Sequence, residues 1–227
     1  MLDIGANLED VRQRIRTAAQ RVGRNPEEIT LLAVSKRIDR ARIEAGLRAG
    51  AHALGESRVQ EAEQKIPDIE GDAEWHFIGP LQSNKATMAA RLFEVIHSLR
   101  RASLVGRLAT SAAAAGRTVR IYVQIEPTTE PTTAETVANT TAICRTVEQA
   151  DGLQLAGLMT MAPYDPDPEA ARPYFATLRR LRDQVAVTKP DLPPLGLSMG
   201  MSGDFEVAIE EGATIVRVGT AVFGDRP

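Results

Sequence analysis

The sequence has few of the residues that build disulfides, metal sites and membrane spans. Cys144 is the only cysteine among 227 residues, so no disulfide can form within the chain. The three histidines are isolated, and no cysteine–histidine cluster has the spacing of metal ligands. No apolar run approaches the roughly 18 residues of a membrane helix. We therefore expect a cytoplasmic protein without a metal site, in a reducing compartment and away from membranes.

The chain also lacks a strong charge of either sign. It carries 27 basic and 30 acidic residues, a formal net charge of −3, and only 4% aromatic residues. Nucleic-acid binding usually needs a basic surface, which this balance does not supply. The sequence also has no long exposed apolar stripe of the kind that would indicate a partner subunit. We expect a monomer that binds a small molecule.

What the sequence does have is a regular alternation of strand and helix patterns. Short β-favouring runs predict strands at 30–35, 51–55, 75–79, 94–99, 118–125, 153–158, 195–198 and 214–218. An amphipathic helix is predicted over 8–22, and later helices over 39–50, 59–66, 86–92, 101–115, 134–150, 168–187 and 202–210. Eight such units predict a single (β/α)₈ TIM barrel over 1–227 with an extra N-terminal helix. The alternative is a doubly wound open sheet.

Lys36 stands at the end of the first predicted strand. In a barrel of this type, the chemistry lies at the carboxyl ends of the strands. One interpretation is an ordinary solvated loop lysine. The other is a partly desolvated amine that forms a Schiff base with a carbonyl compound, because burial lowers a lysine pKa from its usual value of about 10.4.

Two small-residue turns predict an anion site at neighbouring strand ends. The segment 198–204 offers hydroxyl groups and backbone N–H groups where the chain enters a helix. Gly219 and Thr220 follow the last strand and offer a further hydroxyl group and further backbone N–H groups. Loops after strands seven and eight commonly bind phosphate in this fold. The alternative for the first turn is an ordinary helix start capped by Ser202.

Arg217 interrupts the apolar eighth strand and shares a face with Ile215 and Gly219. Its charge needs a polar partner, either a ligand in the barrel mouth or a carboxylate of the core. His76 is either a packed strand residue or part of the same site. Gly196 to Gly200 matches the nucleophile-elbow pattern, but no histidine follows Ser198, so we reject a hydrolase triad.

A lysine, a phosphate cradle and an arginine match the aldehyde, phosphate and ring nitrogen of pyridoxal phosphate. Six segments at their spacings resemble the pyridoxal phosphate homeostasis proteins over nearly the whole chain. They are Ala33–Lys36, Gly55–Glu61, Trp75–Lys85, Gly157–Met159, Leu197–Ser202 and Val216–Gly224. In this sequence Ser57 stands where the family usually has asparagine, and the segment 127–133 also departs from the family pattern.

The resemblance implies a barrel similar to the N-terminal domain of alanine racemase, with pyridoxal 5'-phosphate covalently bound as a Schiff base on Lys36. It implies that Arg217 faces the pyridine nitrogen. The implied cofactor-binding residues at the other strand ends are Ser57, His76, Met159, Ser198, Gly200, Met201, Ser202, Gly219 and Thr220. No catalytic residue and no metal ligand is assigned.

An arginine at the ring nitrogen does not protonate it, because the guanidinium pKa exceeds about 12. The ring then stays a poor electron sink, so we expect a protein of intracellular vitamin B6 homeostasis with little or no turnover, which passes the cofactor to apo-enzymes. One alternative is an amino-acid racemase, which needs a titratable group such as Tyr164 or His76 opposite Lys36. The other is a Schiff-base aldolase that uses Lys36 directly.

Overall fold

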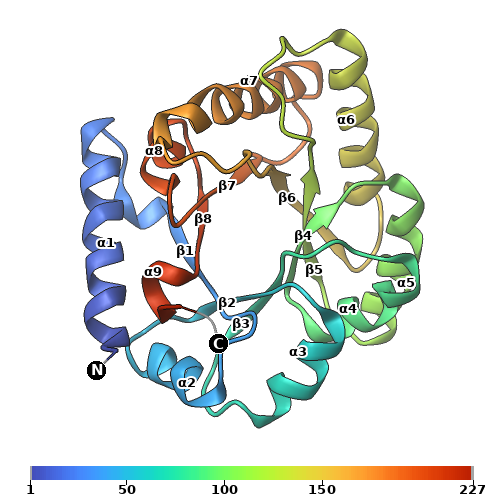
Figure 1. Ribbon diagram of the computed structural model, residues 1–227. Helices are drawn as coiled ribbons and strands as arrows, with labels where there is room; N and C mark the ends of the chain where they lie inside the picture. Colours follow the sequence, from blue (N-terminus) through green and yellow to red (C-terminus); the bar gives the residue numbers. More distant parts are fainter. Residues whose placement is uncertain (1, 226–227) are drawn as a thin grey trace.

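The computed structural model describes residues 2–225, and these form a closed barrel of parallel strands (Figure 1). Within that range the strands are Thr30–Val34 (β1), Ala53–Glu56 (β2), Glu74–Phe77 (β3), Val95–Leu99 (β4), Val119–Gln124 (β5), Leu153–Met159 (β6), Gly196–Met201 (β7) and Ile215–Val218 (β8). Each strand pairs with the next, and β8 pairs with β1. The predicted (β/α)₈ barrel is confirmed, and the open doubly wound sheet is excluded. Residues 1 and 226–227 of the predicted domain lie outside the described range.

Helices form a ring outside the strands (Figure 1). They are Ile4–Arg21 (α1), Arg40–Arg48 (α2), Val59–Lys65 (α3), Ala86–Leu92 (α4), Val105–Ala114 (α5), Ala134–Glu148 (α6), Arg172–Thr188 (α7), Phe205–Glu210 (α8) and Thr220–Phe223 (α9). In the described part of the chain, none of these helices has the length and apolarity needed to cross a membrane. No group of three or more metal-ligating side chains comes together among the same residues.

The N-terminal helix α1 begins earlier than its hydrophobic pattern predicts. It starts at Ile4 rather than Leu8, because the Asp3 side chain accepts a hydrogen bond from the Ala6 N–H at 2.9 Å and caps the first turn. Its buried stripe packs α1 against α8, α9 and α2, on the side of the barrel where β8 meets β1. This helix therefore covers the seam at which the barrel closes.

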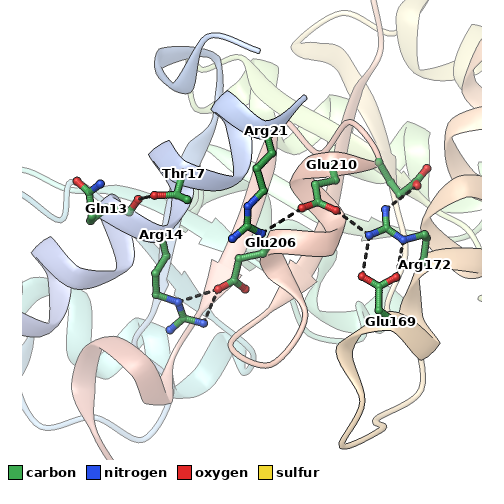
Figure 2. Close-up of polar contacts among 9 residues, drawn as sticks. Gln13, Arg14, Thr17, Arg21, Glu169, Arg172, Glu206 and Glu210 are labelled. Atoms are coloured by element: carbon green, nitrogen blue, oxygen red, sulfur yellow. Dashed lines mark hydrogen bonds and ion pairs between the residues drawn. The ribbon is translucent and has the colours of Figure 1, made fainter. Parts of the chain in front are cut away.

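Ion pairs on the surface connect α1, α8 and α7 (Figure 2). Arg14 of α1 contacts Glu206 of α8 at 2.7 Å. Further along α8, Glu210 contacts Arg21 of α1 at 3.4 Å and Arg172 of α7 at 2.7 Å. Each such pair contributes at most about 1 kcal/mol because the partners are partly solvated. Together they orient α8, the helix that follows the predicted phosphate turn.

The β7 region differs most from its prediction. The strand extends to Met201 instead of ending at Ser198, because Gly200 adopts a φ of +92° and the β7–β8 register shifts there. A methyl group on Gly200 would lie 2.5 Å from the Ala208 Cβ, so the position needs glycine. The predicted helix start at Ser202 is wrong, since α8 begins at Phe205.

The barrel interior contains a small apolar cluster beneath the mouth. Its buried members are Leu32, Ala53, Val95, Tyr122, Met159 and Ile215. The same interior also holds fully buried polar side chains, including His76, His97, Ser198 and Arg217. Barrel interiors are usually filled by branched apolar residues, so this polar content requires a specific arrangement of hydrogen bonds.

Candidate functional site at the mouth of the barrel

A pocket of about 370 Å³ opens at the carboxyl ends of the strands. Its lining residues are Val34, Ile78, Met161, Tyr164, Met201, Ser202, Gly203, Arg217, Gly219 and Thr220. Five of the predicted site residues, namely Met201, Ser202, Arg217, Gly219 and Thr220, meet in this pocket. Larger or better enclosed hollows exist elsewhere on the surface, but this one lies where barrel enzymes place their chemistry.

Lys36 lies in the turn that follows β1, two residues beyond Val34 of the pocket lining, and is half-buried. The turn has an uncommon backbone shape, since Arg37 has a φ of 59° in the left-handed region. The Arg37 N–H donates to Glu61 Oε1 at 2.8 Å and holds that shape. Strained backbone of this kind is concentrated at functional sites.

A partly buried ionic cluster supports the Lys36 turn. Lys65 Nζ donates to the Ser35 carbonyl at 3.1 Å and contacts Glu56 Oε1 and Glu61 Oε1, each at 2.9 Å. Ser35 Oγ also donates to Glu56 Oε1, at 2.8 Å. We call Ser35, Glu56, Glu61 and Lys65 the lysine-side cluster. It joins the residue before Lys36 and the residue after it to α3.

Burial decides the direction of the pKa shift for Glu56 but not for Glu61. Glu56 is fully buried, and burial raises its pKa despite the opposing effect of Lys65. Burial also acts to raise the pKa of Glu61, but the N–H of Arg37 and the ammonium of Lys65 outweigh it, so that pKa is lowered. Glu56 Oε2 has no hydrogen-bond partner in the described part of the chain. The carboxylate of Glu56 is therefore held by one oxygen only.

Arg217 is buried on β8, the strand that pairs with β1, and 4% of its surface is exposed. Its Nη1 donates to Ser198 Oγ and its Nη2 to the Thr160 carbonyl, each at 2.9 Å. No carboxylate within residues 2–225 forms an ion pair with it, so the alternative of a core ion pair is wrong. Burial lowers the Arg217 pKa to about 10, and Asp204 only partly offsets this through space. A buried cation with neutral partners lines the pocket.

The turns after β7 and β8 are joined to each other. Ser202 Oγ accepts a hydrogen bond from the Gly219 N–H at 3.2 Å, so Ser202 bridges the two turns instead of capping α8. Asp204 Oδ1 accepts from the Met201 N–H at 2.5 Å and closes the β7 turn. A methyl group on Gly203 would meet nothing within 4 Å, so the surface beside this residue is open.

The six other predicted site residues are not among the lining residues of the pocket, and they are Lys36, Ser57, His76, Met159, Ser198 and Gly200. Ser198 lies beneath it, between Arg217 and His97, and is fully buried. His76 and Met159 are buried deeper in the barrel. Ser57 is half-buried at the end of β2, where its carbonyl oxygen would lie 2.0 Å from a methyl group on Gly79. Their predicted roles toward a cofactor stay predictions. Gly200 shapes the backbone of β7 as described above.

Sequence reasoning missed the residues that support the site from within the fold. Glu56 ends β2, which is a usable signal, and His97 is a polar residue within the apolar strand β4, but neither was assigned a role. Lys65 follows Glu61 by four residues on α3, which reads as an ordinary surface pair on a helix. Only the barrel brings Lys65 under the turn of Lys36.

The fold and the mouth define a class of barrel proteins related to alanine racemase. The family model for the alanine racemase N-terminal domain matches residues 6–227. Within that class, a pyridoxal phosphate homeostasis protein of Escherichia coli K12 is 39% identical, over 100% of this chain and 98% of the relative. One of Mycobacterium bovis is 35% identical, over 96% and 91%. This chain belongs to the family of pyridoxal phosphate homeostasis proteins.

A solved structure from the same family is also similar. PipY of Synechococcus elongatus PCC7942, whose structure contains bound PLP, superposes with a TM-score of 0.83. It is 34% identical, and the match covers 97% of this chain and 100% of PipY. The similarity extends over the whole barrel rather than over a single motif.

Proposed function

We propose that this protein binds pyridoxal 5'-phosphate in the pocket at the barrel mouth, as a Schiff base on Lys36, and serves pyridoxal phosphate homeostasis with little or no turnover. The observation that carries the proposal is Arg217, a fully buried cation that lines the pocket without a carboxylate partner. An unpaired buried charge is costly, so an electron-rich ligand is the missing partner.

The donor set of the pocket suits this ligand in two places. Arg217 supplies N–H groups to the lone pair of a ring nitrogen. The joined turns at Ser202 and Gly219 supply a hydroxyl group and backbone N–H groups for a phosphate. The pocket volume of about 370 Å³ is in the range of small-molecule sites.

Lys36 and Arg217 would have different roles, one at the aldehyde of the ligand and the other at its ring nitrogen. The Lys36 amine forms one carbon–nitrogen double bond with the ligand aldehyde and water is released, so the linkage needs no further reactant. When bound, the cofactor supplies a reactive aldehyde and an electron-accepting ring. Arg217 cannot transfer its proton to the ring nitrogen at neutral pH, since even its lowered pKa of about 10 stays well above 7. This keeps the ring a weak electron sink and favours holding over turnover.

A protein that holds a reactive aldehyde reversibly can keep its free concentration low and release it to apo-enzymes. This part of the proposal is supported by the names of the relatives, which refer to pyridoxal phosphate homeostasis. It is also supported by the bound PLP in the PipY structure. The half-buried position of Lys36 is consistent with exchange, because water and an attacking amine can reach it.

The test is an absorption spectrum after addition of pyridoxal phosphate and desalting. Wild-type protein is expected to retain the yellow band of a Schiff base, and Lys36→Ala to lose it. Lys189→Ala is the matched control, because Lys189 lies at the C-terminus of α7, away from the mouth. Borohydride reduction followed by peptide mapping should place the label on Lys36. Wild-type protein that desalts colourless, or a label on another lysine, would contradict the proposal.

Turnover is tested separately on the same preparation. Single enantiomers of amino acids are incubated with the loaded protein, and their optical purity is followed against Lys36→Ala. Unchanged purity supports a holding protein. Racemisation above the Lys36→Ala level would contradict the holding role and indicate an amino-acid racemase.

A further inference from the structure

A chain of hydrogen-bonded side chains runs through the barrel interior from Arg217 at the mouth to Glu74 at the start of β3, and all of them except Glu74 are buried. Arg217 Nη1 lies 2.9 Å from Ser198 Oγ, which lies 2.8 Å from His97 Nδ1. His97 Nε2 lies 2.9 Å from His76 Nδ1. His76 Nε2 lies 2.6 Å from Glu74 Oε1, and the other Glu74 oxygen pairs with Arg120. We call Ser198, His97, His76 and Glu74 the interior chain.

The two ends of the interior chain determine the position of every proton in it. An arginine only donates, so Ser198 Oγ accepts from Arg217, and the contact left to accept its single proton is His97 Nδ1. His97 then carries its own proton on Nε2 and donates it to His76 Nδ1. His76 in turn carries its proton on Nε2 and donates to the carboxylate of Glu74. All four hydrogen bonds point the same way, away from the mouth.

The surroundings of both histidines favour this neutral arrangement. His97 is fully buried, and burial, then the positive charges around it, lowers its pKa well below the usual value. Burial also lowers the pKa of His76, although Glu74 opposes the effect. The His97 ring is stacked on Tyr122, with centroids 4.7 Å apart and planes 8° from parallel. The ring is therefore held in the orientation that the hydrogen bonds require.

Such a chain does not conduct protons to a ligand, because Arg217 at its end cannot accept one. Its effect is on the orientation of the Arg217 guanidinium. If His97 carried its proton on Nδ1, Ser198 Oγ would accept hydrogen bonds from both His97 and Arg217. The hydroxyl proton of Ser198 would then have no acceptor in either of these contacts, at a fully buried position where an unsatisfied donor is costly.

We propose that His97 and His76 are positioning residues for Arg217, which hold Ser198 as a hydrogen-bond acceptor and so fix the guanidinium at the pocket. The assignment of the protons stands on the geometry of the interior chain alone. Its consequence for the ligand rests on the proposed function, namely that Arg217 binds the ring of pyridoxal phosphate. The two parts can be tested independently.

The first experiment reads the protons directly in wild-type protein without any ligand. Long-range ¹H–¹⁵N correlation spectra at neutral pH distinguish the two neutral forms of each imidazole and the cation. His97 and His76 are both expected to carry one proton, on Nε2. A His52→Gln variant removes the signals of the exposed third histidine and completes the assignment. A proton on Nδ1 of either buried ring, or a charged ring, would overturn the proposal.

The second experiment asks whether the interior chain acts through Arg217. Dissociation constants for pyridoxal phosphate are measured by equilibrium dialysis for wild type, His97→Phe, Arg217→Met and the double variant. His97→Phe keeps the ring on Tyr122 but removes both nitrogens, and about tenfold weaker binding is expected. In the Arg217→Met background the same change should have no further effect. A His97→Phe effect of equal size in both backgrounds would show a general structural role and contradict positioning.

The outcomes separate this inference from the proposed function. Wild-type protein that fails to bind pyridoxal phosphate rejects the proposed function, while the spectra still decide the arrangement of protons. Wild-type protein that binds the ligand, with spectra showing Nδ1–H histidines, rejects the inference alone.

Discussion

The two sides of the barrel mouth are built from different chemistry. The lysine-side cluster is ionic, with Lys65 paired to Glu56 and Glu61 beneath the turn of Lys36. The adjacent part of the mouth, at β8, positions Arg217 through neutral groups, the Ser198 hydroxyl and the Thr160 carbonyl. The cluster pairs its two carboxylates with the ammonium group of Lys65, whereas Arg217 forms no ion pair with a carboxylate of residues 2–225. The comparison indicates that the first side shapes the backbone around the reacting group and the second side is built for a ligand.

Removing Lys65 should therefore cost more stability than removing Arg217. Lys65→Met leaves the Glu56 carboxylate buried without its partner, and a loss of about 3–5 kcal/mol in the free energy of unfolding is expected. Arg217→Met leaves no carboxylate without its ion-pair partner. We therefore expect a loss of only about 1–2 kcal/mol in the free energy of unfolding, from the two hydrogen bonds of Arg217. Urea unfolding of the proteins without ligand measures both. Equal losses would remove the distinction between the two sides.

A double variant serves as the control for Lys65. Glu56→Gln combined with Lys65→Met removes both charges, so it should recover a large part of the stability lost in Lys65→Met. A double variant that is less stable than Lys65→Met would show that packing, rather than an unpaired charge, is responsible.

The backbone of β7 tests the second side without changing a charge. Gly200→Ala should lower the free energy of unfolding by about 2–4 kcal/mol, because it adds strain at a φ of +92° and a clash with Ala208. Gly203→Ala is the matched control, three residues along the same turn. Gly203 has open space around it, and a change within about 0.5 kcal/mol is expected. If both variants behave alike, the turn is not held by Gly200.

The smallest expected effect is a pH dependence that comes from Glu56. Its pKa is raised in the folded protein, so the stability that it contributes is complete below its unfolded pKa of about 4.5 and is lost as the pH rises toward the folded pKa. Relative to wild type, Glu56→Gln should thus become progressively more stable as the pH increases from about 4.5, by about 1.4 kcal/mol for each pKa unit. Urea unfolding of both proteins across this range measures the difference. A difference that is constant with pH, or that moves the other way, would contradict the raised pKa.

Much of the fold follows from local sequence patterns. The alternation of short β-favouring runs with amphipathic helices predicted the closed barrel, and helix 86–92 was predicted with its observed bounds. Errors occurred where a single side chain or glycine decides a boundary. Asp3 extends α1 backward by four residues, and Gly200 lets β7 continue for three more. The extension of β7 leaves no trace in hydrophobic periodicity, whereas Ile4 continues the buried stripe of α1 and was missed.

For the site, the sequence by itself determined which residues stand at strand ends, because a strand followed by a polar turn can be recognised locally. Lys36 and Arg217 were recognisable in this way. What supports them depended on the tertiary structure. Ser198 and His97 are 101 residues apart, and Lys65 reaches Ser35 across 30 residues. Contacts of this range arise only when the barrel closes, since closure brings every strand's inward side chains into one small interior and makes each of them find a partner there.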